Sequence, residues 1–394
     1  METKDLKFGE LDEGFTIKEA IEEAKRCLNC KNPLCIKGCP IENNIPGFIH
    51  QLSMGNIGAA MHINEKSNLP AICGRVCPHE KQCVGHCVLN AKKRPIQVGK
   101  LERFAADFDG NMGLIRDKIP QKTRGKVAVI GSGPAGLTVA GDLAREGFNV
   151  MIFEGEQEAG GVLMYGIPEY RLPKDVVRKE VKKIEALGVT FITQCMVGQA
   201  ITVDDMFEQG FDAVFIGSGT ALPKSLDTPG YTLRGVTQSS YFLRMASLCN
   251  TGSIGREEVP VKQGDIVGVI GGGNVAMDAA RTALRMGAGK VYVLFRRTMD
   301  QMSALQTEYN EAVEEGVEFL WETTVTEFIG SNGKLEKIRV KTPEGENFMP
   351  IDRILLAIGS RPANRIVSTT SGIEVDDTGY VITKERPYGM TTRK

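Results

Sequence analysis

The chain has 394 residues, of which 42% are hydrophobic and 25% are charged, and its formal net charge is −1. A chain of this length is expected to form about two or three domains, and the composition is that of a globular protein. No apolar run approaches the length of a membrane-spanning helix, and the balanced charge argues against a broad nucleic-acid-binding surface. The sequence therefore predicts neither a membrane nor a nucleic acid as a partner.

The first 115 residues show helical patterns and no strand pattern. Thr16 and Glu19 form a capping box before apolar residues at helical spacing. Residues 45–64 and 98–109 also have helical spacing. We therefore expect a small helical domain over residues 1–120.

Eight of the ten cysteines lie in two tight groups within this helical part. Several thiolates on closely spaced loop positions are typical of iron–sulfur ligation, and eight of them could hold two [4Fe–4S] clusters. Zinc is the alternative metal, but it favours two separated cysteine pairs that close one tetrahedron. Disulfides are the other alternative, and the absence of an apolar leader before Phe15 favours a reducing, cytoplasmic setting instead. The two groups are Cys27, Cys30, Cys35 and Cys39, and Cys73, Cys77, Cys83 and Cys87.

A polar, turn-prone linker at 119–125 separates the helical part from a region with a different sequence pattern. Short β-branched runs then alternate with amphipathic helices, which indicates parallel sheets with crossover helices. One strand–turn–helix–strand unit spans 126–154, and a second with the same order spans 266–297. The chain thus contains two dinucleotide-binding βαβ units.

The first glycine turn follows the strand 126–130 directly and opens a helix. In such a turn the first glycine permits the tight bend, the second lets a pyrophosphate approach the backbone, and the third lets the helix pack closely. Glu154 ends the next strand, where a carboxylate can accept hydrogen bonds from a ribose 2′-hydroxyl. The predicted cofactor-binding residues here are Gly131, Ser132, Gly133, Pro134, Ala135, Gly136 and Glu154.

The second glycine turn has the same context, but its second strand ends in Arg296 and Arg297 instead of an acid. Two guanidiniums can bind a 2′-phosphate, which a carboxylate would repel, so the pattern favours NADP. A solvated strand end is the alternative interpretation of this arginine pair. The turn contributes Gly271, Gly273, Asn274, Val275 and Ala276 as predicted cofactor-binding residues.

Two nucleotide folds in one chain suggest a flavin in one and a nicotinamide in the other. Hydride transfer from nicotinamide to flavin needs orientation and a dry site more than an acid or a base, and flavin can release electrons singly to clusters. The four histidines lie in the helical part without a convincing catalytic partner. No catalytic acid or base is therefore assigned.

The cysteine groups and glycine turns, together with three further segments, resemble the glutamate synthase small-chain family. Relatives of that family include the large subunit of NADH-dependent ferredoxin:NADP oxidoreductase and the amino-terminal half of dihydropyrimidine dehydrogenase. The resemblance covers essentially the whole chain. The further segments are Cys73-Gly-Arg-Val-Cys-Pro78, Val98-Gly-Lys-Leu-Glu-Arg-Phe104 and the run from Gly160 to Pro173.

The resemblance implies an α/β architecture in which the helical iron–sulfur domain precedes two Rossmann-like domains, the second inserted in the first. It implies an FAD domain over 121–240 and 355–394 and an NAD(P)H domain over 241–354. Gly161 and Arg171 would then lie along the flavin, and Gly359 near the nicotinamide nucleotide.

The resemblance also implies interleaved ligation of two clusters. Cys27, Cys30, Cys35 and Cys87 would hold one cluster. Cys39, Cys77 and Cys83 would hold the other, with Glu102 in the position of the fourth ligand. Cys73 would be a bystander, although spacing alone nominates it.

Two departures from the family pattern bear on function. The segment Met302-Ser-Ala-Leu-Gln306 lacks an arginine that the family usually has, which weakens the preference for NADP over NAD. The sequence ends at Lys394, before a Gly-Asp segment that in the family contacts the flavin, so we expect a truncated FAD domain or impaired flavin affinity.

The leading functional hypothesis is a subunit that passes electrons from NADPH through FAD and two [4Fe–4S] clusters to a larger partner. Glutamate synthase, with glutamine and 2-oxoglutarate handled by the partner, is the favoured setting. The alternatives are the ferredoxin:NADP transhydrogenase subunit, a non-catalytic docking or assembly subunit, and a stand-alone reductase that feeds ferredoxin or quinones.

Overall fold

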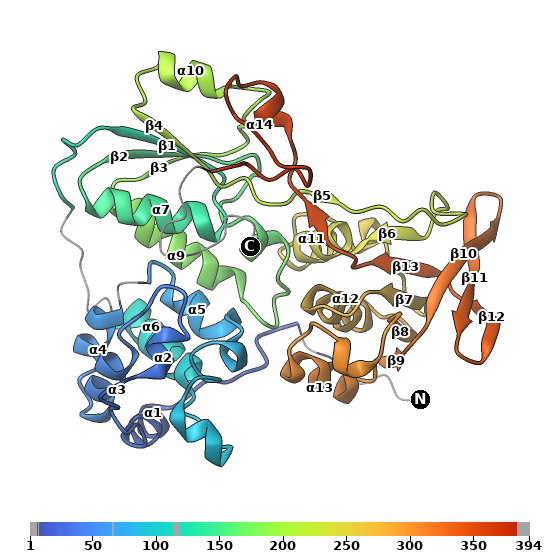
Figure 1. The fold of residues 1–394 in the computed structure, drawn as a ribbon, viewed down its shortest axis with the longest axis horizontal. Coiled ribbons are helices and arrows are strands. Elements are labelled where there is room, and N and C mark those ends of the chain that lie inside the picture. The colour runs from blue at the N-terminus through green and yellow to red at the C-terminus, as the bar shows by residue number, and fades with distance from the viewer. Residues whose placement is uncertain (1–5, 7, 65–66, 113–118, 384–394) are drawn as a thin grey trace.

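A computed structural model describes residues 6, 8–64, 67–112 and 119–383. A helical domain lies beside two α/β domains, and a small antiparallel sheet projects from the second of these (Figure 1). The helices within the described ranges are all too short or too polar to cross a bilayer.

The helical domain confirms the pattern expected of the first 115 residues, because its described part contains helices and no strand. The predicted capping box begins the first helix: the Glu19 amide donates to Thr16 Oγ1 at 3.3 Å and the Thr16 amide to Glu19 Oε2 at 2.8 Å. The segment 45–64 forms two helices instead of one, because Gly55 takes a left-handed conformation with φ of 78° between them. The helices are α1 (Ile17–Lys25), α2 (Leu34–Lys37), α3 (Ile45–Ser53), α4 (Ile57–Asn64), α5 (Pro70–Val76) and α6 (Val98–Met112), with short 3₁₀ turns at His79–Lys81 and Val88–Lys92.

The first α/β domain contains a four-stranded parallel sheet in the order β3-β2-β1-β4. Its strands are β1 (Lys126–Ile130), β2 (Asn149–Phe153), β3 (Thr190–Ile192) and β4 (Ala213–Ile216). Helices α7 (Pro134–Arg145) and α9 (Lys174–Ala186) lie on the face toward the helical domain, while α10 (Val203–Glu208) lies on the other (Figure 1). A short helix, α8 (Val162–Tyr165), follows the glycine pair at 160–161.

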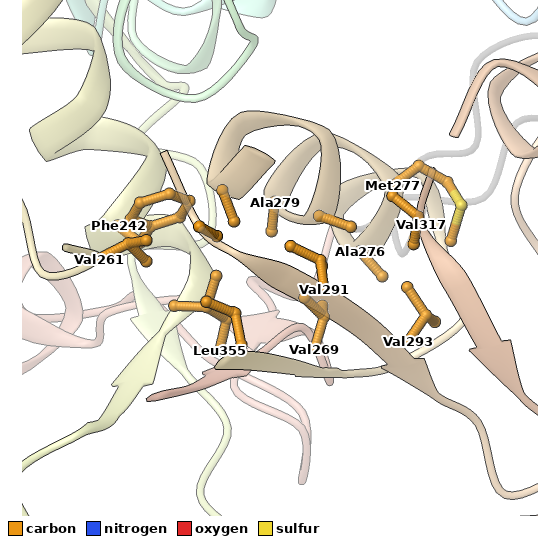
Figure 2. Close-up of a cluster of buried hydrophobic side chains, with 14 of the residues drawn as sticks. Phe242, Val261, Val269, Ala276, Met277, Ala279, Val291, Val293, Val317 and Leu355 are labelled. Carbon is orange, nitrogen blue, oxygen red and sulfur yellow. The ribbon is translucent and has the colours of Figure 1, made fainter. Parts of the chain in front are cut away.

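The second α/β domain repeats this plan with a five-stranded parallel sheet in the order β6-β13-β7-β8-β9. Helix α12 packs on this sheet through alanines, whose small side chains let the helix approach closely over Val269 and Val291 (Figure 2). The strands are β6 (Val236–Gln238), β7 (Ile266–Ile270), β8 (Lys290–Leu294), β9 (Glu318–Leu320) and β13 (Arg353–Leu356), and the helices are α11 (Ser239–Asn250), α12 (Asn274–Arg285) and α13 (Gln306–Glu315).

The chain returns to the first α/β domain after β13, as expected for an inserted second domain. Helix α14 (Arg365–Ser368) brings Ile366 into a buried cluster with Val203 and Met206 of that domain. The five-stranded sheet reaches a few residues beyond the predicted range 241–354 at both ends. Part of the predicted second FAD segment, 384–394, lies outside the described residues.

Two small sheets have no counterpart in the sequence interpretation. Strands β10 (Thr324–Ser331), β11 (Lys334–Thr342) and β12 (Gly345–Pro350) form an antiparallel meander between β9 and β13. Strands β5 (Leu222–Pro223) and β14 (Ser360–Arg361) pair antiparallel where the chain crosses between the two α/β domains.

Candidate functional site

The first glycine turn joins β1 to α7 and leaves open space at the helix N-terminus. Gly131 has φ of 90°, and a Cβ there would lie 2.6 Å from the carbonyl oxygen of Gly217 after β4. A Cβ on Gly136 would collide with the carbonyl oxygen of Gly131. A Cβ on Gly133, the N-cap residue of α7, would meet no atom within 4 Å. The turn is therefore closed where the protein packs and open where a pyrophosphate would approach the helix dipole.

Glu154, Ser132 and Gly161 gather around this turn. One Glu154 carboxylate oxygen accepts a hydrogen bond from the Ser132 amide at 2.9 Å and another from the Ser132 hydroxyl. The Gly160 amide donates to Ser132 Oγ at 2.9 Å, and a Cβ on Gly161 would lie 3.0 Å from Gly133 Cα. Glu154 thus orients the turn itself, and its contact with a ribose stays a prediction.

The second glycine turn, between β7 and α12, has the same geometry. Gly271 has φ of 145°, and a Cβ there would collide with the carbonyl oxygen of Ala357 at the end of β13. Gly273 is the N-cap of α12, and the nearest atom to a Cβ there is Ser303 Oγ at 3.4 Å, an ordinary contact. Ala276 fits at the third position and is fully buried against the sheet. The predicted open helix N-terminus is therefore present in both domains.

The segment 302–306, which departs from the family pattern, braces this second turn. The Ser303 and Ala304 amides both donate to the Gly272 carbonyl at 3.0 Å. The Leu305 amide donates to Asn274 Oδ1 at 2.8 Å. Asn274 is thus a structural support of the turn, while the adjacent Val275 is half exposed. Sequence reasoning missed this role because the segment has no recognisable motif.

Arg296 and Arg297 are exposed immediately after β8, beside the second turn. Their side chains form no ion pair with any described residue, so both guanidiniums are available to a ligand. Gly359 takes φ of 95° just after β13, where its carbonyl oxygen accepts a hydrogen bond from the Lys224 amide at 3.0 Å. These placements are compatible with the predicted nucleotide site.

Arg171 binds carboxylates of the second α/β domain, and its predicted place along the flavin is not tested by these contacts. Its Nη1 donates to both Asp278 carboxylate oxygens at 2.9 Å, and its Nη2 lies 2.7 Å from Glu308 Oε1. Arg285 stacks over the ring of the neighbouring Tyr170 at 3.9 Å from its centroid. Burial raises the pKa of Glu308 to about 7, an effect that the arginines oppose. The cluster fixes how the two nucleotide domains meet, which no single sequence motif reveals.

The first set of cysteines surrounds one pocket in the helical domain. Cys27, Cys30 and Cys35 line it from the chain around α2, and Cys87 joins them from a segment more than fifty residues later. The rest of the lining is mainly apolar side chains of the domain core, such as Ile49. Burial raises the pKa of Cys35 to about 11 and also raises that of Cys27, so metal loading must displace protons from these thiols. The grouping is the one that the resemblance implies for the first cluster.

The second set, Cys39, Cys77 and Cys83, lies around the buried carboxylate of Glu102 on α6. Burial raises the pKa of Cys83 to about 12, and the nearby charges of Glu102 and Cys39 add to the rise. Burial also raises the pKa of Glu102 well above the usual range. Cys73 lies beside Cys77 and contacts Ser67 Oγ at 3.3 Å, so it occupies the same neighbourhood as the predicted ligands. The choice of Glu102 over Cys73 as a ligand stays a prediction.

The cysteine arrangement fits iron–sulfur clusters better than a zinc ion. Among the described residues, no three histidine, cysteine or acidic side chains converge closely enough to hold a single metal ion. A zinc site needs its ligands on one ion, whereas each cysteine of a [4Fe–4S] cluster binds a different iron and stands further from its neighbours.

The two cysteine sets differ in what surrounds them. Helix α5, which carries Cys73 and leads into Cys77, packs on the first α/β domain through Leu69 and Ile72. Asn68 just before it donates to Asp142 Oδ1 of α7 at 2.6 Å. The second set therefore lies next to the first nucleotide domain, while the pocket of the first set opens among side chains exposed to solvent.

Comparisons with known proteins agree with this division of the chain. Residues 4–114 match the family described as dihydropyrimidine dehydrogenase domain II, 4Fe-4S cluster, and residues 125–391 match the pyridine nucleotide-disulphide oxidoreductase family. FprA from Mycobacterium tuberculosis, solved in complex with NADPH, aligns with a TM-score of 0.55 and 19% identity over 65% of this chain and 74% of its own, which shows a shared fold.

Curated relatives cover nearly the whole chain. The glutamate synthase [NADPH] small chain of Halomonas elongata is 35% identical over 99% of this chain and 87% of its own length. The Escherichia coli protein of the same name is 33% identical over 98% and 86%. The NAD-dependent dihydropyrimidine dehydrogenase subunit PreT of Escherichia coli is 34% identical over 89% and 82%.

These matches define an NAD(P)H-dependent oxidoreductase that joins a [4Fe–4S] domain to a flavin- and nicotinamide-binding unit. The chain belongs to the glutamate synthase small-chain family. The predicted family, fold class, enzyme class and kinds of cofactor are thereby confirmed.

Proposed function

We propose that the chain is the NADPH-oxidising subunit of a glutamate synthase. In this proposal it takes electrons from NADPH through FAD and two [4Fe–4S] clusters to a larger subunit, which forms glutamate from glutamine and 2-oxoglutarate. The relatives named as NADPH-dependent small chains support both the donor and the larger partner. The work would take place in the cytoplasm, since seven cluster-binding thiols need a reducing compartment.

The observation that carries the proposal is that helix α5, which leads into Cys77, packs on the first nucleotide domain, while the pocket of the first cysteine set opens among exposed side chains. Bound flavin would accept hydride from NADPH and release electrons singly to clusters. The residues of the chain bind the two nucleotides and the clusters and fix their positions. The open turns at Gly133 and Gly273 would seat the two pyrophosphates, and Arg297 with its neighbour would bind the 2′-phosphate.

The contact between the two nucleotide domains supports hydride transfer. The buried cluster of Arg171, Asp278 and Glu308 joins the domains and leaves little freedom for one to move against the other. Fixed orientation of donor and acceptor is the main requirement of a hydride step. No side-chain acid or base is needed for it, in agreement with the absence of a catalytic assignment.

The proposal is tested by combining the purified, cofactor-loaded chain with the large glutamate synthase subunit of the same organism. NADPH, glutamine and 2-oxoglutarate should yield glutamate only when both proteins are present, and the Arg297→Glu variant should slow the NADPH-driven reaction. Steady oxidation of NADPH by the chain with quinones, unaffected by the large subunit, would instead support a stand-alone reductase. No NADPH oxidation under any of these conditions would support a docking role.

A further inference from the structure

The rim of the pocket that Cys27, Cys30, Cys35 and Cys87 line is both apolar and basic. Three of its lining side chains are exposed although they are large and apolar: Leu28 is 62% exposed, Leu34 40% and Val88 43%. Grouped exposed apolar residues mark interaction surfaces.

Five exposed cations lie in two segments around the same pocket; the acids beside these segments are Glu42, directly after the first, and Glu23, which accepts a hydrogen bond from the Gln97 amide at 2.9 Å and pairs with Arg26. Two of the chain segments that line it, 27–41 and 87–96, contain five lysines and arginines and no aspartate or glutamate. This contrasts with the whole chain, whose 48 basic and 49 acidic residues nearly balance. All five side chains are exposed, and no described residue forms an ion pair with them. We call these five residues the basic rim: Lys31, Lys37, Lys92, Lys93 and Arg94.

We propose that this face is the docking surface for the electron-accepting protein, and that the acceptor presents an acidic ring around an apolar centre. The inference rests on the proposed function, in which electrons leave through the first cysteine set. Opposite charges on the two rims would steer the encounter and fix the orientation, while Leu28, Leu34 and Val88 would provide a dry contact. The acceptor's redox centre would then meet the pocket at its open side and take one electron at a time.

The test uses two probe acceptors with the same redox centre and opposite surface charge, native basic cytochrome c and succinylated acidic cytochrome c. Each haem takes one electron, and NADPH supplies two per molecule. The test variant is Lys92→Glu with Lys93→Glu. The matched control is Lys334→Glu with Lys341→Glu, which changes the same charge on two exposed lysines of β11, in the small sheet far from the helical domain (Figure 1).

At low ionic strength we expect the rim variant to reduce acidic cytochrome c about tenfold more slowly than the unmodified chain, and basic cytochrome c faster. The control variant should change neither rate, and high salt should remove the differences. Leu28→Gln should slow the acidic acceptor at every salt concentration, because it removes apolar contact and no charge.

Equal rates for the rim and control variants would overturn the docking surface. NADPH bleaching of the flavin without any acceptor separates this outcome from failure of the proposed function. If NADPH bleaches the flavin of all variants normally and the rate of cytochrome c reduction does not depend on the rim charges, only the docking surface is wrong. If NADPH does not bleach the flavin of the unmodified chain, the electron-transfer function itself fails.

Discussion

Gly133 and Gly273 allow each nucleotide site to be blocked without disturbing the fold. A Cβ on Gly133 meets nothing within 4 Å, and one on Gly273 meets only Ser303 Oγ at 3.4 Å. Their backbones, with φ of −67° and −104°, are conformations that alanine adopts freely. Any effect of Gly133→Ala or Gly273→Ala on binding must therefore come from the ligand that approaches the open backbone.

The two substitutions should change the stability of the protein only slightly but weaken cofactor binding strongly. Alanine is a poorer N-cap than glycine but restricts the unfolded chain, so the two effects offset to within about 1 kcal/mol. The melting temperature of each variant without cofactors should thus stay within about 4 °C of the unmodified chain. A methyl group at the pyrophosphate position would break at least one charge-assisted hydrogen bond, about 1.5–3 kcal/mol, which is about a ten- to hundredfold weaker affinity.

The assay is isothermal binding of FAD and of NADP⁺ to each variant, with thermal melting of the cofactor-free proteins. Gly133→Ala should weaken FAD binding alone, and Gly273→Ala should weaken NADP⁺ binding alone, so each variant is the control for the other. Unchanged FAD affinity in a normally folded Gly133→Ala protein would refute the placement of the pyrophosphate. A reversed pattern would show that the two cofactors occupy the opposite domains.

Three further predictions concern the remaining site residues. Arg297→Glu should raise the KM for NADPH far more than that for NADH, because it places a carboxylate where the 2′-phosphate should sit, and equal rises would remove the argument for NADPH. Glu102→Ala should lower the iron content and alter the paramagnetic spectrum of one cluster while Cys73→Ala spares both, and the opposite result would make Cys73 the ligand. Arg171→Met should lower the free energy of unfolding by about 3–5 kcal/mol because it removes the ion-pair partner of the buried Asp278 carboxylate, while Glu308 keeps Arg281. Arg178→Met, at a pair with Glu158 in which both side chains are more than a third exposed, should cost less than about 1 kcal/mol in the same denaturant titration, and equal costs would contradict the interdomain role.

The elements around the glycine turns were predictable because local signals determine them. Strands 126–130 and 266–270 are short β-branched runs followed at once by glycines; the first has the predicted bounds, and the second begins where the predicted unit 266–297 does. Helices α7 and α12 begin inside the glycine turns, at Pro134 and Asn274, because Gly133 and Gly273 act as their N-caps. The same glycines therefore belong to the turn and mark the start of the helix.

The antiparallel meander and the interdomain contacts could not be predicted, for different reasons. Strand β11 alternates exposed lysines with buried Leu335, Ile338 and Val340 irregularly, since register shifts in its pairing with β10 interrupt the period of two. Arg171 and Asp278 are 107 residues apart, and only the packing of two separate domains brings them together. The family resemblance implied the grouping of Cys27, Cys30 and Cys35 with the distant Cys87 that the pocket shows, whereas the choice between Glu102 and Cys73 stays a prediction.

The most direct test of the electron-transfer account is an anaerobic titration of the purified, cofactor-loaded chain with NADPH and, separately, with NADH. The account predicts that about one to two NADPH per chain bleach the flavin absorbance and fade the cluster band, because the flavin takes two electrons and each cluster can take one, and that NADH does so only at much higher concentration. Bleaching by NADH as readily as by NADPH would contradict the assigned donor. A bound flavin that neither nucleotide bleaches would contradict the account as a whole.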